Sequence, residues 1–268
     1  AGAGGVTGTL AALKRPADGY TLIQSGIGQN AVAHALNPSV GYDSVKDFVH
    51  VTQVHEGPNV LVVKPDSAYQ SVKALIDGSK NGAGIKYGYT PAASGHMAME
   101  LMIQMQQTCI RGDKGEKLCM GGKFRGVPYS GGKPLLDAVV KGDVDAIFIN
   151  VDAAERYIKD GQIKPLAVSS RARSRLLPDV PTMSEAGYFG FEAVSWSGIS
   201  VAKATPPAIV ARLETELAKI MASPAIKQFM EPNGFTIPAQ GSQLYASYVS
   251  KEIDRWSRLV RVAGIKQP

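Results

Sequence analysis

The sequence predicts an α/β fold in which strands alternate with helices along the chain. Three observations support this class: short apolar runs, amphipathic segments with helical spacing between them, and short connections from one to the next. A chain of 268 residues with 44% hydrophobic residues is long enough for one large or two medium domains with substantial cores. Such alternation predicts largely parallel sheets, with ligands bound beyond the carboxyl ends of the strands.

The individual elements follow from these patterns. The apolar runs predict strands at residues 20–24, 59–63, 85–89, 144–149, 165–168 and 194–201. Helical spacing predicts helices at residues 31–36, 71–80, 96–106, 135–141, 153–160, 207–222 and 242–262. The Gly-rich start of the chain is predicted to be a loop, because no strand precedes it and a GxGxxG fingerprint is absent.

The charge distribution argues against a nucleic-acid-binding protein. The net charge is +6, but the basic residues are scattered, and the tightest group (Arg171, Arg173 and Arg175) lies in a predicted surface loop. No nucleic-acid recognition motif accompanies this charge. A mild positive field instead suits the attraction of an anionic small ligand.

The junction after the strand at 85–89 is the first candidate binding segment. Thr90, Ala92, Ser94 and His96 lie between this strand and the following helix. Small residues let a ligand approach the backbone, and the free N–H groups at the start of a helix attract anions. Ser94 is equally compatible with plain capping of the helix.

Three further junctions have the same character. Tyr129 and Gly131 precede the helix at 135–141, Asn150 follows the strand at 144–149, and Ser25 and Gln29 follow the strand at 20–24. Asn150 could also cap the helix that begins near residue 153. Four strand-to-helix junctions with small and polar residues are stronger evidence for a ligand site than a single junction would be.

Catalytic and metal chemistry have little support in the sequence. There is no G-x-S-x-G elbow, and the four histidines do not form an H-E-x-x-H pattern. An α/β enzyme that uses His96 or Asn150 is the alternative, but no nucleophile is paired with a base. We therefore expect neither catalysis nor a metal or cofactor.

Four segments of the sequence match motifs of one known family. They are PADGYTL at 16–22, KYGYTPAASGHMAMELM at 86–102, VPYSGGKPLLDAVVKGDVDAIF at 127–148 and KPLAVSSRARSRLLPDVPTMSEAGY at 164–188. Together with shorter matches they extend along nearly the whole chain, in the family's order, which makes the match specific. On these motifs the sequence resembles the Bug-type periplasmic receptors of tripartite tricarboxylate transporters.

The resemblance implies a two-lobed Venus-flytrap fold and a receptor without enzymatic activity. One lobe would comprise residues 1–60 and 194–268, and the other residues 61–193. The protein would capture a small organic carboxylate in the periplasm and deliver it to the membrane subunits of a transporter; a ligand-sensing module of the same fold is the alternative. The implied ligand contacts are Ser25, Gln29, Thr90, Ala92, Ser94, His96, Tyr129, Gly131 and Asn150.

The sequence departs from the family pattern in two places, before residue 2 and at residues 108–123. The family has a strand, a loop, a helix and a second strand before the GAGG segment at 2–5. We expect that this βαβ portion of the first lobe, and any signal peptide, are missing from the sequence, or that another chain fills the gap. The segment at 108–123 is longer than in the family and carries both cysteines. Cys109 and Cys119 could be free thiols or a disulfide across a turn, and export favours the disulfide.

Overall fold

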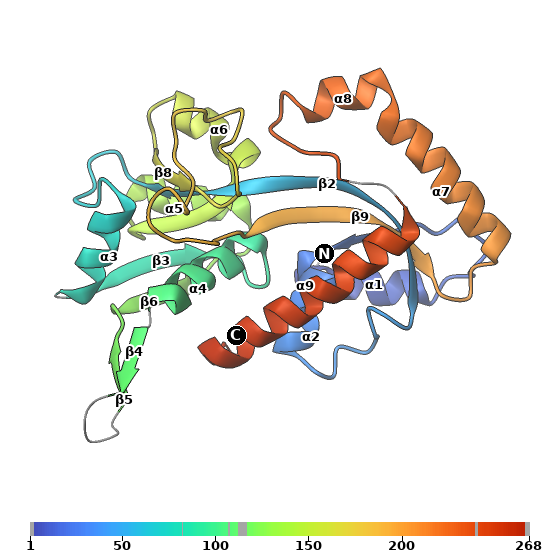
Figure 1. Cartoon of the computed structure of the whole chain (residues 1–268), viewed down its shortest axis with the longest axis horizontal. Coiled ribbons are helices and arrows are strands. Elements are labelled where there is room, and N and C mark those ends of the chain that lie inside the picture. The colour runs from blue at the N-terminus through green and yellow to red at the C-terminus, as the bar shows by residue number, and fades with distance from the viewer. Residues whose placement is uncertain (1–2, 82, 107, 112–116, 239–240, 266–268) are drawn as a thin grey trace. The chain divides into compact units, whose positions relative to one another are not determined.

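The computed structural model describes residues 3–81, 83–106, 108–111, 117–238 and 241–265. The chain divides into two compact units: unit 1 comprises Ala1–Gly57 and Ser195–Pro268, and unit 2 comprises Pro58–Val194. The strands β2 (Phe48–Val63) and β9 (Val194–Ala202) have residues in both units. Figure 1 labels the elements along the chain.

Unit 2 is built on a mixed sheet with the strand order β2, β7 (Ala146–Asn150), β3 (Ile85–Tyr89) and β6 (Phe124–Pro128). β3 pairs in parallel with both β6 and β7, whereas β2 pairs antiparallel with β7 and with β8 (Lys164–Val168). The expectation of largely parallel sheets therefore holds only for β3, β6 and β7. The difference arises because β2 precedes the first strand–helix repeat and runs against its strands.

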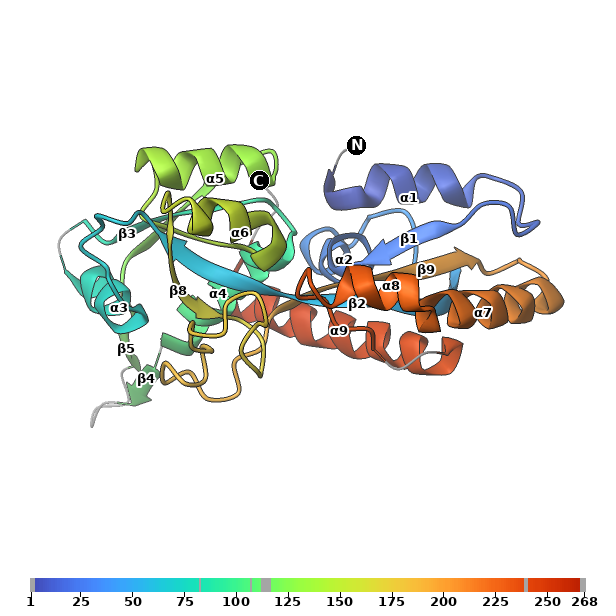
Figure 2. The same ribbon diagram turned by 90° about the horizontal axis from the view of Figure 1, so that it is seen from above.

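Helices cover both faces of this sheet. Figure 2 shows α5 (Gly132–Lys141) and α6 (Val151–Lys159) on one face, and α3 (Val72–Lys80) and α4 (Ser94–Gln106) on the other. Alternate side chains of a strand point to opposite faces. Accordingly Ile147 and Ile149 of β7 pack into a core with α5 and α6, while Phe148 stacks on Phe191 with ring centroids 6.0 Å apart. A strand that is apolar on both faces is therefore buried from both sides.

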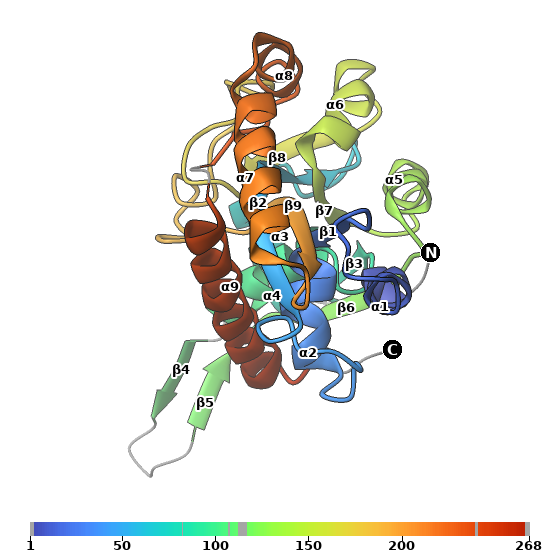
Figure 3. The same ribbon diagram turned by 90° about the vertical axis from the view of Figure 1, so that its right-hand side faces the viewer.

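Unit 1 contains the strands β1 (Ile23–Gly26) and β9 in antiparallel pairing, with β2 next to β9. Its helices are α1 (Val6–Leu13), α2 (Ala33–Leu36), α7 (Pro207–Ala222), α8 (Pro224–Met230) and α9 (Ser242–Ala263), with a 3₁₀ turn at Ala3–Gly5 and a π-helical turn, η2, at Ile27–Val32. Figure 3 shows α1 and α9 on opposite sides of these strands. Val6, Leu10 and Leu13 of α1 pack on a core that includes Ile23 and Phe48.

A buried carboxylate joins α9 to β9. Glu252, which is 6% exposed, accepts hydrogen bonds from the indole nitrogens of Trp196 (2.9 Å) and Trp256 (2.7 Å). A buried charge is tolerated where several donors satisfy it. The bond from Trp196 attaches α9 to the sheet, whereas the bond from Trp256 lies within α9.

Some elements differ from those that the sequence predicts. The chain start forms α1 rather than a loop, β2 begins at Phe48 rather than at residue 59, and β6 and α8 were not expected. The first helix forms because its apolar face is covered by the core of unit 1, a contact with residues distant in sequence. The strand at 124–128 has no fully buried residue, so its apolar signal is weak.

Candidate functional site

A recess of about 220 Å³ lies in unit 2 at the carboxyl ends of β3 and β7. Because β3 and β7 are parallel, their ends meet at one edge of the sheet, and α4 and α6 begin there. The helix α5 begins beside them at Gly132. The recess is lined by Asn59, Thr90, Ala93, Ser94, Gly95, His96, Gly132, Leu135, Phe148, Ile149, Asn150 and Ala153.

Three polar side chains meet in the recess. The hydroxyl of Ser94 lies 3.1 Å from Asn59 Oδ1 and 3.2 Å from Asn150 Oδ1. The two asparagines are opposite each other in the antiparallel pairing of β2 with β7. Asn59 is fixed further, because its Nδ2 donates to the carbonyl of Ala193 (2.8 Å) and its backbone N–H donates to Ser169 Oγ (2.8 Å).

The side-chain amide nitrogen of Asn150 is available to a ligand. Within the described part of the chain, its Nδ2 has no hydrogen-bond partner, and the residue is partly exposed. It occupies the position before α6 without capping the helix through its side chain. An asparagine amide carries two N–H donors, so Asn150 has donors available to a ligand oxygen.

The recess favours an anion without using a cation. The first N–H groups of α4, α5 and α6 have no partner within their own helices. Each helix start carries roughly half a positive charge. None of the residues that line the recess is Lys, Arg, Asp or Glu. Three helix starts, one hydroxyl and one amide therefore suit a single carboxylate group.

The backbone at the entry to α4 is closely packed. A Cβ atom on Gly95 would lie 2.2 Å from the carbonyl oxygen of Phe148, so only glycine lets the first turn of α4 approach β7 this closely. Ala92 has a φ of 62° and is the only non-glycine residue with a positive φ in the described chain. This conformation costs an alanine about 1–2 kcal/mol, and such strain is concentrated at functional sites.

His96 is part of a buried aromatic cluster at the recess. Its ring stacks on Tyr89 with centroids 4.2 Å apart and planes inclined by 18°. Its Nε2 lies 3.7 Å from Glu100 Oε1, which also accepts a hydrogen bond from the Tyr87 hydroxyl (2.5 Å). Burial lowers the pKa of His96 to about 4 and raises the pKa of Glu100. His96 is therefore neutral at pH 7.

The remaining predicted ligand residues of unit 2 lie beside the recess. Thr90, Ser94, His96 and Asn150 line it, whereas Ala92, Tyr129 and Gly131 do not belong to its lining. Tyr129 is partly buried against the core, and Gly131 precedes the first residue of α5. Sequence reasoning missed Asn59, because it begins an apolar run; a polar residue at the start of a buried strand is the signal that could have found it.

The two predicted residues of unit 1 have partners within that unit. Ser25 is fully buried, and its Oγ is hydrogen-bonded to Tyr245 Oη (2.7 Å) and Ser200 Oγ (2.8 Å). The Nε2 of Gln29 donates to the carbonyl of Gln24 (2.9 Å). In this structure the Ser25 hydroxyl thus takes part in a buried network that holds β1, β9 and α9 together.

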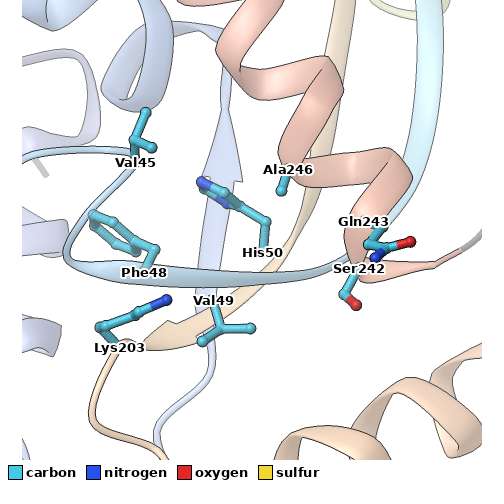
Figure 4. A pocket seen from close by; sticks show the side chains of 8 residues that line it. All are labelled: Val45, Phe48, Val49, His50, Lys203, Ser242, Gln243 and Ala246. Atoms are coloured by element: carbon cyan, nitrogen blue, oxygen red, sulfur yellow. The ribbon is translucent and has the colours of Figure 1, made fainter.

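A second recess, in unit 1, has few groups for a ligand. It measures about 260 Å³, and Figure 4 shows its lining: Val45, Phe48, Val49, His50, Lys203, Ser242, Gln243 and Ala246. Both ring nitrogens of His50 are already hydrogen-bonded. The N–H and hydroxyl of Ser242 bind the carboxylate of Glu214 at 2.8 and 3.1 Å. The start of α9 is therefore neutralised by the chain's own carboxylate, and we favour the recess in unit 2.

Two other features are absent from the described residues. There, no helix is long and apolar enough to cross a membrane, and no group of His, Cys, Asp and Glu side chains is arranged to hold a metal ion. The backbone pairs Cys109 with Cys119 in the antiparallel ladder of β4 (Thr108–Arg111) and β5 (Lys117–Met120). The side chains of both cysteines lie outside the described part of the structure, so the disulfide stays a prediction.

Comparisons with known proteins agree with the fold. A family model described as "Tripartite tricarboxylate transporter family receptor" matches residues 1–265. The protein BugT of Bordetella pertussis is 33% identical over 267 residues, which are 99% of this chain and 78% of BugT.

Solved structures give the same result. The protein Rpa4515 of R. palustris, solved with adipate, is 30% identical with a TM-score of 0.86, over 99% of this chain and 85% of that one. The protein MatC of Rhodopseudomonas palustris, solved with malate, is 25% identical with a TM-score of 0.81, over 97% of this chain and 85% of that one. This chain therefore belongs to the receptor family of the tripartite tricarboxylate transporters, whose members are solute-binding proteins of the two-lobed periplasmic type.

Proposed function

We propose that this protein captures a small organic carboxylate and delivers it to the membrane subunits of a tripartite tricarboxylate-type transporter in the periplasm. The observation that carries the proposal is the uncharged recess at the starts of α4, α5 and α6, with the Ser94 hydroxyl and the Asn150 amide inside it. Adipate and malate, bound by the two similar proteins, are both small dicarboxylates.

The proposed roles of the residues follow from their positions. The carboxylate accepts hydrogen bonds from Asn150 Nδ2, from N–H groups in the first turn of α4 and from Ser94 Oγ, whose single proton turns to the ligand from the asparagine oxygens that it faces in this structure. Backbone N–H groups and neutral donors bind a carboxylate strongly because the acceptor is charged. We keep Ser25, Gln29, Thr90, Ala92, Tyr129 and Gly131 as proposed further contacts. The two compact units are the proposed lobes, with boundaries near residues 60 and 194.

Calorimetry against mono-, di- and tricarboxylates tests the binding step. The substitution Ser94→Ala removes a hydroxyl that contacts the bound anion, and losing a hydrogen bond to a charged group costs about 1.5–3 kcal/mol. We therefore expect affinity to fall by roughly ten-fold or more. Ser39→Ala is the matched control. Ser39 is exposed, and within the described chain its backbone N–H donates a hydrogen bond to Asn37 whereas its hydroxyl makes none.

Unchanged affinity of Ser94→Ala, together with that of the control, would place the carboxylate elsewhere. Delivery is tested separately by uptake of the labelled acid into cells that carry the membrane subunits. Uptake should require this protein and should fall in parallel with the affinity of Ser94→Ala. Binding without any effect on uptake would separate the receptor from transport.

A further inference from the structure

The ring of His96 presents a buried nitrogen without a partner. Within the described residues, His96 Nδ1 is buried and accepts or donates no hydrogen bond. The side chain is 5% exposed and belongs to the lining of the recess in unit 2. Leaving a buried polar atom unsatisfied costs about 1–3 kcal/mol, so such an atom in a binding recess calls for a partner that the chain itself does not supply.

The surroundings of the ring decide which hydrogen-bonding role Nδ1 plays. Burial lowers the pKa of His96 to about 4, so the imidazole is neutral and carries one proton. Its other nitrogen, Nε2, lies 3.7 Å from the carboxyl oxygen of Glu100, which favours the proton on Nε2. The Tyr87 hydroxyl donates to the same oxygen and holds it in place. Nδ1 is therefore left with a lone pair, and its partner must be a donor.

A carboxylate cannot be that donor, because it only accepts hydrogen bonds. An ammonium group is disfavoured, because three helix starts make the recess positive and no acidic side chain lines it. A hydroxyl group is neutral, small and able to donate. It can stand next to a carboxylate on the same ligand, as in a 2-hydroxy acid.

We infer that the ligand is a hydroxy acid and that His96 determines this specificity by accepting a hydrogen bond from the ligand's hydroxyl at Nδ1. This inference rests on the proposed function, since the carboxylate of the same ligand occupies the starts of the helices. Ligands without the hydroxyl leave the lone pair unsatisfied. A site built to pair a hydroxyl rejects analogues that lack it far more strongly than an apolar pocket does.

Matched pairs of acids test the inference by calorimetry: malate with succinate, lactate with propionate, and mandelate with phenylacetate. The members of each pair differ only in the hydroxyl. We expect the wild-type protein to prefer the hydroxy acid of the pair that fits by about ten-fold or more.

Two variants connect that preference to Nδ1. His96→Asn places an amide oxygen near the position of Nδ1 and should retain part of the preference. His96→Gln moves its polar atoms toward the position of Nε2 and should abolish the preference, so that the two members of a pair bind with equal affinity. A merely structural role of His96 would weaken both members of a pair equally.

Equal binding of both members by the wild-type protein would overturn the inference, as would a preference that survives in His96→Gln. If none of the six acids binds, the proposed function itself fails for acids of these sizes. Should His96→Gln not fold, ¹⁵N NMR of the histidine ring in the wild-type protein gives the answer. The Nδ1 signal should shift on addition of the hydroxy acid and not on addition of its partner, and equal shifts would refute the inference.

Discussion

The substitution Asn150→Asp is the sharpest test of where the carboxylate binds. It replaces an amide nitrogen by an oxygen of nearly the same size at the position before α6. The oxygen that faces Ser94 at 3.2 Å keeps its role as an acceptor. Asp is also a favourable residue at a helix start, where a negative charge meets the positive end of the helix. The fold should therefore be retained, with a melting temperature equal to or above that of the wild type.

The effect on binding should be large. The bound carboxylate accepts a hydrogen bond from Asn150 Nδ2 in the proposed site, so its charge centre would lie roughly 4–5 Å from that of the new carboxylate, given the usual hydrogen-bond lengths. Two like charges at this distance repel each other by about 3–4 kcal/mol at an effective dielectric constant of 20. This energy corresponds to a loss of affinity of about two to three orders of magnitude.

Isothermal titration calorimetry at constant salt measures this loss, and thermal unfolding without ligand checks the fold. Asn37→Asp is the matched control, because it changes the net charge equally and Asp can still accept the hydrogen bond from the Ser39 N–H that Asn37 accepts at 2.9 Å. The control should bind normally. Full affinity in Asn150→Asp would show that no carboxylate sits at the start of α6, and the proposed site would have to be abandoned.

Three further predictions address other parts of the molecule. Folding lowers the pKa of His96 from 6.5 to about 4, so the unfolded chain binds this proton more readily. The free energy of unfolding, measured by denaturant titration, should therefore fall by about 3 kcal/mol as the pH falls from 6.5 to 4, and His96→Gln should lack this part of the pH dependence. Tyr129→Phe removes a hydroxyl that has no hydrogen-bond partner in the described chain, so it should weaken ligand binding without lowering the melting temperature; unchanged binding would remove Tyr129 from the proposed contacts. Cys109 and Cys119 are opposite each other in the β4–β5 ladder. Directly opposite residues of an antiparallel ladder have Cα atoms about 4.5–5.5 Å apart, a separation that a disulfide can span. Mass spectrometry of the non-reduced protein should therefore find the cross-linked peptide, and two free thiols in protein taken from the periplasm would contradict the prediction.

The sequence by itself determined the alternation of strands and helices and four of the five polar residues that line the recess. Thr90, Ser94, His96 and Asn150 were identified because each follows an apolar run and precedes a helical pattern. Both signals are local, since they depend on neighbours a few residues away. The parallel arrangement of β3 and β7 then brings the ends of their strands to one edge, as the alternation implies.

Tertiary structure alone decided which groups become partners across long stretches of chain. Asn59 meets Ser94 only because β2 pairs antiparallel with β7, in a register that places Asn59 opposite Asn150. Ser25 is held by Tyr245, 220 residues away. The neutrality of His96 is likewise a consequence of burial, which no pattern of neighbouring residues reveals. Local periodicity specifies what an element is, whereas register and burial depend on the whole packed core.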